Sequence, residues 1–318
     1  MKLDFETIKN ITVGAVEIWQ ENDAIRFLKC SKNQLNEWQN ISLELYRNAR
    51  ASTGIRLDFF TNSPFVTVYP VEGTKFEIKI NGILTEVAHV DYSEQNPFFT
   101  INLDNGCELN HVVVFFPSHF ESGGIKSVEV ADCAIVKRNK FDNRFLFMGD
   151  SITQGYNAKY DCLSYAFLVS EYFNAESVIQ GVGGSCFSPA TVMDINFKPN
   201  VVFVAYGTND FGCLPTLENL KINCFEYLTK VKKFYSDAKI IVITPIWRMD
   251  EHQEKPMGNF KQCKNVIKQV ALDLGLIAVD GETMVYKNPD FMKDTVHPND
   301  LGFCIYANNL IKQIEKII

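Results

Sequence analysis

The chain shows two successive patterns of apolar and polar positions. In the first half, short stretches of strand-like sequence are separated by turn-forming residues such as the pairs Asn81-Gly82 and Asn105-Gly106. These stretches occupy residues 54–63, 65–73, 75–84, 98–106 and 111–118. Short strands at such spacing predict an antiparallel β-sandwich. We find no convincing long helical period in this half of the chain.

The second pattern begins near residue 143. Short, continuous apolar runs, which are typical of parallel strands covered on both faces, occupy residues 144–149, 177–181, 201–207, 239–246 and 276–281. Segments of helical period lie between or after them, at 163–173, 217–235, 260–275 and 301–317. Strand alternating with helix predicts a doubly wound α/β domain. We therefore predict two domains, residues 1–140 and 141–318.

Composition narrows the class of protein. With 46% hydrophobic and 22% charged residues, the 318-residue chain suits an ordinary soluble globular protein. The net charge of −7 argues against a nucleic-acid or membrane partner. No secretory signal is visible, and no run approaches the roughly 18 apolar residues of a membrane span. Nine scattered cysteines without a CxxC pair indicate reduced thiols and no metal site. These features predict a cytoplasmic location.

Three polar clusters follow the first three strands of the α/β half. They are Gly149-Asp150-Ser151, the glycine-rich segment 181–185 (GVGGS) and the segment 207–210 (GTND). Each has a simple structural explanation, because Asp and Ser cap helices and Gly-rich or Asn-containing segments form turns. Ligands, however, gather at the carboxyl ends of the strands in such sheets. The coincidence of all three clusters therefore favours a binding or catalytic site.

A serine nucleophile needs a base, because its hydroxyl is unreactive at neutral pH. His297 lies just before the last predicted helix, and Asp294 precedes it by three residues. This spacing allows the carboxylate to hold Nδ1–H while Nε2 takes the proton from Ser151. A polar turn that caps the last helix explains the same residues equally well. The N–H groups of Ser151 and Gly184 and the amide of Asn209 are candidate donors to an oxyanion.

The four segments together resemble the blocks of the SGNH, or GDSL-like, hydrolase superfamily. GDSITQG resembles the serine block, GVGGS the glycine block, GTND the asparagine block and DTVHP the DxxH block, over about residues 143–318. The resemblance implies a flavodoxin-like three-layer fold and a mechanism with Ser151 as nucleophile, His297 as base and Asp294 as its orienting partner. It implies no metal and no organic cofactor. The chain departs from many members at Gln180, where they carry Asn.

The segment 48–64 is similar to the jelly-roll-like β-sandwich that precedes the SGNH domain in two-domain carbohydrate esterases, including acetyl xylan esterases. This similarity predicts a serine esterase that removes O-acetyl groups from a sugar or oligosaccharide. Asp150, Trp247 and Arg248 are candidate substrate-binding residues, since an indole face suits a sugar ring and Arg binds hydroxyls. The alternatives are a lysophospholipase or acyl-thioesterase and a non-catalytic carbohydrate-binding protein. The sandwich is also a candidate interface for a homo-oligomer.

Overall fold

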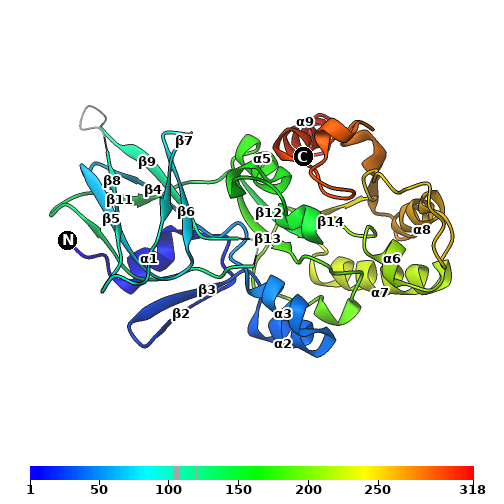
Figure 1. Ribbon diagram of the computed structural model, residues 1–318, viewed down its shortest axis with the longest axis horizontal. Helices are drawn as coiled ribbons and strands as arrows, with labels where there is room; N and C mark the ends of the chain where they lie inside the picture. The colour runs from blue at the N-terminus through cyan, green and yellow to red at the C-terminus, as the bar shows by residue number, and fades with distance from the viewer. Residues whose placement is uncertain (104–107, 119) are drawn as a thin grey trace.

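The computed structural model describes residues 1–103, 108–118 and 120–318. Antiparallel strands form one end of the molecule, and a parallel sheet flanked by helices forms the other (Figure 1). The change from antiparallel to parallel pairing falls between β11 (Val136–Arg138) and β12 (Asn143–Gly149). The division into domains at residues 140 and 141 stays a prediction.

The amino-terminal half contains two antiparallel sheets, which confirms the predicted β-sandwich class. The first has the order β1-β4-β9-β6-β7, with β11 paired to β4, and its further strands are β1 (Thr12–Val13), β4 (Arg56–Thr61), β6 (Lys75–Ile80), β7 (Ile83–His89) and β9 (Asn110–Phe115). The second has the order β2-β3-β10-β5-β8, formed by β2 (Glu17–Glu21), β3 (Ala24–Leu28), β5 (Phe65–Glu72), β8 (Phe99–Asn102) and β10 (Gly124–Val130).

Alternate residues of these strands build the sandwich core. Side chains two positions apart, which point to the same face of a strand, are fully buried in one apolar cluster, including Leu57, Phe59, Val66, Val68, Phe76, Ile78, Val112 and Val114. The expected turn between β6 and β7 is present, because Asn81 and Gly82 both adopt positive φ (52° and 84°). The expected Asn105-Gly106 turn lies outside the described residues.

The sequence shows no convincing long helical period in this half, and the three helices that its described residues form are short, with 7, 10 and 8 residues. The structure places α1 (Phe5–Ile11), α2 (Lys32–Ile41) and α3 (Leu43–Arg50) there. Ser31 and Gln34 form a capping box at the start of α2, and Ser42 caps α3. Both helices are short, and only Gln34 and Trp38 in α2 and Asn48 and Ala49 in α3 are buried, so the cap residues were the better signal.

The carboxyl-terminal half is a three-layer α/β structure, as predicted. Its parallel sheet has the order β13-β12-β14-β15-β16, which is the flavodoxin-like arrangement. The strands that follow β12 are β13 (Ala175–Gly181), β14 (Val201–Ala205), β15 (Lys239–Ile243) and β16 (Ile277–Val279). The helices are α4 (Ser151–Gln154), α5 (Tyr165–Tyr172), α6 (Asp210–Cys213), α7 (Leu217–Phe234), α8 (Phe260–Asp273) and α9 (Asp300–Ile314).

Successive residues of the parallel strands enter two different apolar clusters, one on each face of the sheet. Phe145, Phe147 and Phe203 pack with α5 and α9 on one face. Leu146 and Val202 pack with α7 and α8 on the other. Because both faces are covered, the strands are apolar throughout, which is the pattern that the sequence shows.

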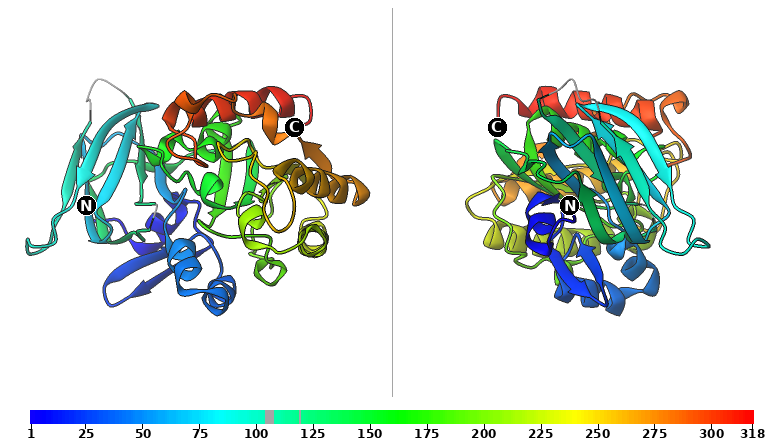
Figure 2. Two further views of the ribbon diagram at one scale, coloured as in Figure 1. Left: turned by 45° about the vertical axis from the view of Figure 1, so that its right-hand side comes forward. Right: turned by 90° about the vertical axis from the view of Figure 1, so that its left-hand side faces the viewer.

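The antiparallel sheets lie beside the α/β half (Figure 2), and residues of β9 share an apolar cluster with residues of α5. The ring of Phe115 in β9 lies 4.8 Å from that of Phe167 in an edge-to-face contact. Glu77 of β6, only 1% exposed, accepts hydrogen bonds from the backbone N–H groups of Asp161 (2.9 Å) and Cys162 (3.2 Å). The two halves are therefore joined by buried polar contacts as well as by apolar ones. Within the described part of the chain, no helix is both long and apolar enough to cross a membrane.

Candidate active site

Ser151 stands at the turn between β12 and α4. Asp150 caps the helix by accepting a hydrogen bond from the N–H of Ile152 (2.9 Å), and Ser151 is its first residue. The turn is so tight that a Cβ on Gly149 would lie 2.1 Å from Oγ1 of Thr153. The capping explanation and the nucleophile explanation are thus compatible, because the cap fixes the turn that presents Ser151.

A chain of hydrogen bonds joins Ser151 to two residues near the carboxyl terminus. Its Oγ lies 2.8 Å from Nε2 of His297, and Nδ1 of His297 lies 2.9 Å from Oδ2 of Asp294. If Nδ1 carries the proton that faces the carboxylate, Nε2 is left to accept the proton of the serine hydroxyl. The structure therefore brings the three predicted residues into the order that nucleophilic catalysis requires.

The carboxylate of Asp294 is held by several further donors. Its Oδ1 accepts the backbone N–H groups of Val296 and His297 at 2.8 Å, and its Oδ2 accepts the amide of Asn157 at 2.7 Å. Burial acts to raise the pKa of Asp294, but the bonds from these backbone groups and from the His297 ring outweigh it and lower the pKa below its ordinary value. The sequence analysis missed Asn157, whose only signal is its place in the turn that follows α4.

The glycine-rich turn after β13 lies against the serine turn. The N–H of Gly183 donates to Oε1 of Gln154 in α4 at 2.7 Å. Gly184 is exposed with φ of +80°, a backbone conformation that favours glycine. Of the described residues other than its chain neighbours, only Leu45, at 3.7 Å, would lie within 4 Å of a Cβ at Gly184. The space beside this backbone is therefore open for a ligand.

Asn209 and Asp210 join the third strand end to the glycine-rich turn. Nδ2 of Asn209 donates to the carbonyl of Ser185 at 3.0 Å, and an amide nitrogen has a second hydrogen to offer. Oδ1 of Asp210 accepts the N–H of Phe187 at 3.1 Å. Gly184 and Asn209 thus belong to one hydrogen-bonded loop cluster beside Ser151, while their roles as oxyanion donors stay a prediction.

The three candidate substrate-binding residues are not presented to a ligand in the way we expected. Trp247 is 5% exposed and packs in the apolar cluster of α5 and α9, so the prediction of an open indole platform is wrong. The guanidinium of Arg248 is paired with Asp250 and donates to the carbonyl of Thr208 at 2.9 Å. Asp150 is 2% exposed and serves as a helix cap. Arg248 therefore supports the segment that carries Asn209 instead of facing solvent.

Residues 147–303 match the model of the GDSL-like Lipase/Acylhydrolase family. This part of the chain belongs to that family. The match confirms the predicted superfamily and its class of chemistry, the hydrolysis of carboxylic esters.

Solved structures share the fold of the GDSL-like domain together with the preceding sandwich. Salicylyl-acyltransferase SsfX3 from a tetracycline biosynthetic pathway is 14% identical, with a TM-score of 0.82 over 96% of this chain and 94% of that one. A family two carbohydrate esterase from Cellvibrio japonicus is 13% identical, with a TM-score of 0.74 over 98% and 96%. A family two carbohydrate esterase from Clostridium thermocellum, in complex with cellohexaose, is 15% identical, with a TM-score of 0.68 over 84% and 93%. None of the curated proteins matches the sequence.

A buried lysine ties the amino-terminal half to the glycine-rich turn of the GDSL-like domain. Nζ of Lys29, with no exposed surface, donates to the carbonyls of Gly181 (2.8 Å) and Asn48 (3.0 Å) and to Oγ1 of Thr53 (3.0 Å). Burial lowers its pKa to about 7. Nδ2 of Asn48 donates in turn to the carbonyl of Gly183 at 2.8 Å. Gly181 and Gly183, which precede the predicted oxyanion donor Gly184, are therefore held by side chains that lie outside the GDSL-like domain.

Gln180, where the sequence departs from many relatives, takes part in the same junction. Its Nε2 donates to the carbonyl of Lys29 at 3.0 Å, and its side chain also bonds that of Gln34 in α2. The departure therefore has a structural role in this chain, because the longer amide side chain reaches both residues of the amino-terminal half.

Replacing Lys29 tests this junction. In Lys29→Met the buried acceptors lose their donor, so we expect the free energy of unfolding in urea at pH 7 to fall by about 1–3 kcal/mol. Lys32→Met, which replaces an exposed lysine at the first position of α2, should change it by less than about 0.5 kcal/mol. Equal values for the two variants would contradict a structural role for Lys29.

Asp210 predicts a pH dependence of stability. Burial raises its pKa from 3.8 to about 7, and Oδ2 has no hydrogen-bond partner in the described part of the chain. Between about pH 4 and pH 7 the folded state keeps a proton that the unfolded state has released, so stability falls as the pH rises through this window. Asp210→Asn removes this contribution. Relative to the unmodified protein, its free energy of unfolding should rise on the order of 2–4 kcal/mol from pH 4 to pH 7.

The control for Asp210 is Asp237→Asn, which changes an exposed carboxyl. Its stability should follow that of the unmodified protein across the same pH range. The free energy of unfolding is measured by urea titration at each pH. Parallel pH curves for all three proteins would contradict a raised pKa for Asp210 in the folded state.

Proposed function

We propose that the chain is a serine esterase that removes acetyl or other short acyl groups from carbohydrates. The observation that carries the proposal is the hydrogen-bonded series Ser151–His297–Asp294, with Oγ to Nε2 at 2.8 Å and Nδ1 to Oδ2 at 2.9 Å. It stands at the carboxyl end of β12 in the GDSL-like domain, and the segments that carry Gly184 and Asn209 follow the two strands paired with β12.

Catalysis would start with attack by the serine on the ester. As Oγ of Ser151 bonds to the carbonyl carbon, its proton passes to Nε2 of His297. The carboxylate of Asp294, with its low pKa, stabilises the imidazolium that forms. The carbonyl oxygen becomes an oxyanion, to which the N–H groups of Ser151 and Gly184 and the amide of Asn209 donate.

The intermediate then collapses to release the alcohol of the sugar. The carbon–oxygen bond of the ester breaks, and the departing oxygen takes the proton from His297. This leaves an acyl group on Ser151. Water attacks it while giving a proton to His297, and that proton returns to Oγ of Ser151 as the acid leaves. Apart from the substrate and water, the cycle uses only side chains and backbone groups of the protein.

A carbohydrate substrate is supported by the structural neighbours, several of which are carbohydrate esterases that share both halves of this chain. The family description also names lipases, so a lysophospholipase or acyl-thioesterase is the competing proposal. A binding protein without catalysis is less well supported, because such a protein has no need of an aligned serine, histidine and aspartate. The eight described cysteines are free thiols, which supports a reducing, cytoplasmic compartment.

The nucleophile is tested with Ser151→Ala. Loss of Oγ removes the attacking atom, so kcat for p-nitrophenyl acetate should fall by about 10³-fold or more. The melting temperature should change little, because the backbone of the turn is kept. Ser236→Ala, an exposed serine outside the site, should keep full activity. Retained turnover in Ser151→Ala would refute the assignment.

The acyl group and the alcohol are tested separately. Among p-nitrophenyl esters, we expect kcat/KM for the acetate to be at least tenfold higher than for the octanoate. This ratio corresponds to a difference of about 1.4 kcal/mol or more in activation free energy. Acetylated xylo-, manno- and cello-oligosaccharides should release acetate, measured in solution. Preference for octanoate would favour the lipase or thioesterase alternative. Hydrolysis of p-nitrophenyl esters without acetate release from any sugar would support the esterase activity and contradict the carbohydrate substrate.

A further inference from the structure

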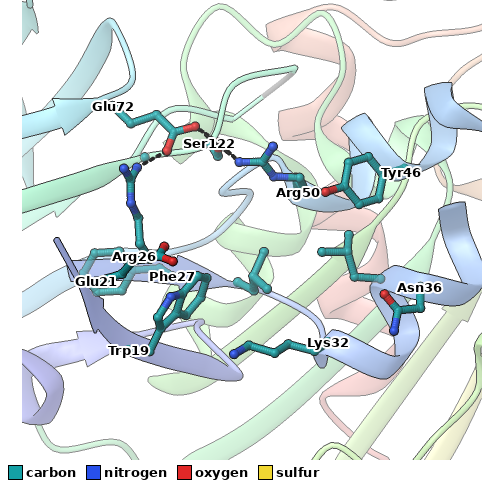
Figure 3. Close-up of a pocket in the computed structure, with 13 residues that line it drawn as sticks. Trp19, Glu21, Arg26, Phe27, Lys32, Asn36, Tyr46, Arg50, Glu72 and Ser122 are labelled. Carbon is teal, nitrogen blue, oxygen red and sulfur yellow. Dashed lines mark hydrogen bonds and ion pairs between the residues drawn. The ribbon is translucent and has the colours of Figure 1, made fainter. Parts of the chain in front are cut away.

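A second cavity lies in the amino-terminal half, apart from Ser151 and His297. Its volume is about 570 Å³, within the range of small-molecule sites. Its walls come from the hairpin β2–β3, from α2 and α3, and from the end of β5 (Figure 3). The residues that the argument below uses are Trp19, Arg26, Lys32, Tyr46, Arg50 and Glu72.

Cations outnumber carboxylates around this cavity. Arg26, Lys32 and Arg50 line it together with two acids, Glu21 and Glu72, which gives a local charge of +3 − 2 = +1. The whole chain carries −7, so the excess of positive charge is local. Such a cavity favours an anionic ligand.

The protein already satisfies the carboxylate of Glu72. It pairs with Arg26, lies 3.5 Å from Nη2 of Arg50 and accepts the hydroxyl of Ser122. These contacts use one terminal nitrogen of each arginine, whereas a guanidinium has five N–H donors. Figure 3 shows Arg26 and Arg50 on opposite sides of Glu72, so the acid holds both guanidinium groups in place at the rim of the cavity.

Aromatic side chains form other parts of the wall. Trp19 and Tyr46 are half-buried, and Nζ of Lys32 lies 5.0 Å from the centre of the Trp19 ring. Indole and phenol rings with polar edges suit the mixed apolar and hydroxylated faces of a sugar. Rings and cations together therefore point to a sugar unit that carries a negative group.

We propose that this cavity is a non-catalytic binding site for an acidic sugar unit, one that bears a carboxylate. A single negative charge balances the local excess of +1, whereas a phosphate with about two charges would exceed it. The forked guanidinium groups of Arg26 and Arg50 match the geometry of a carboxylate. That the ligand is a carbohydrate rests in part on the proposed function.

Helix α3 stands between this cavity and the candidate active site. Leu45 and Asn48, three residues apart, face the glycine-rich turn: Asn48 donates to the carbonyl of Gly183, and Leu45 is the residue that an added Cβ at Gly184 would approach. Tyr46 and Arg50, four residues apart, line the cavity. Residues at these spacings share a helix face. A polysaccharide anchored by its acidic unit would thus lie one helix away from the esterase site.

The direct test is binding of unacetylated ligands to the unmodified protein, because these have no ester to hydrolyse. Calorimetry in low salt would compare neutral xylotetraose with a xylo-oligosaccharide of the same length that carries one glucuronate, and with glucose 6-phosphate. We expect the glucuronate-bearing ligand to bind at least fivefold more tightly than the neutral one. Added salt should reduce this difference.

Variants of two arginines on α3 locate the site. Arg50→Gln should weaken binding of the glucuronate ligand about fivefold to tenfold by removing a charge-assisted hydrogen bond. Arg47→Gln makes the same change in charge at an exposed residue outside the cavity lining and should leave binding unchanged. Equal weakening by both variants would indicate only general charge attraction and would overturn the proposal.

Tryptophan fluorescence gives an independent readout. The chain has three tryptophans, and Trp38 and Trp247 are only 4% and 5% exposed. Binding in the cavity should therefore change mainly the emission of Trp19, and Trp19→Phe should abolish the change. A signal that survives in Trp19→Phe would place the ligand elsewhere.

The remaining outcomes are also decisive. Three results would each overturn the acidic-sugar site: equal affinity for neutral and acidic ligands, tighter binding of glucose 6-phosphate, or no binding at about 10 mM ligand, which corresponds to less than about 4 kcal/mol of binding free energy. Because no step of this test requires turnover, a failure here leaves the esterase proposal untouched. Conversely, loss of the esterase proposal would not change the measured affinities.

Discussion

The parallel pairing of β12 with both of its neighbours is the constraint on which the site depends. Gly149 at the end of β12 lies opposite Gly181 of β13 and Ala205 of β14. Parallel strands in register release their following segments at the same edge of a sheet. The serine turn, the glycine-rich turn and the segment of Asn209 are therefore neighbours, although Ser151 and Asn209 lie 58 positions apart in the sequence.

Glycine residues allow these backbone segments to approach one another closely at the edge of the sheet. A Cβ on Gly181 would lie 2.2 Å from the backbone nitrogen of Gln154, and one on Gly149 would lie 2.7 Å from the carbonyl of Ala205. At both positions the neighbouring atom belongs to the backbone and cannot move aside easily. The hydrogen bond from Gly183 to Gln154 then fixes the glycine-rich turn to the helix that begins with Ser151.

The amino-terminal half does more than precede the esterase domain. Lys29 and Asn48 hold the carbonyls of Gly181 and Gly183 from one side, while Gln154 holds the N–H of Gly183 from the other. A turn whose polar groups are bound on both sides loses little freedom when charge develops next to it, which is the property that electrostatic catalysis requires. The same helix that carries Asn48 also forms the wall of the second cavity, so the accessory half is linked to both sites.

Local sequence determined the classes of most strands and of the helices in the second half, and the identity of the serine, glycine, asparagine and histidine segments, but it did not predict α1, α2 and α3. Alternation in the first half and continuous apolar runs in the second reflect burial on one or both faces of a strand, a property that each short stretch carries by itself. Asp294 and His297 are also close in sequence, so their pairing follows from one turn.

Tertiary structure decided what depends on residues distant in sequence. The contact between Ser151 and His297 spans 146 residues and required the order of the parallel sheet. The burial of Trp247 and the hydrogen bond from Arg248 to the carbonyl of Thr208 depend on neighbouring elements, so an end-of-strand position alone suggested an exposure that is absent. The junction at Lys29 was hidden for the same reason: an isolated lysine in a sequence normally indicates a solvated surface, and only packing shows that it is buried.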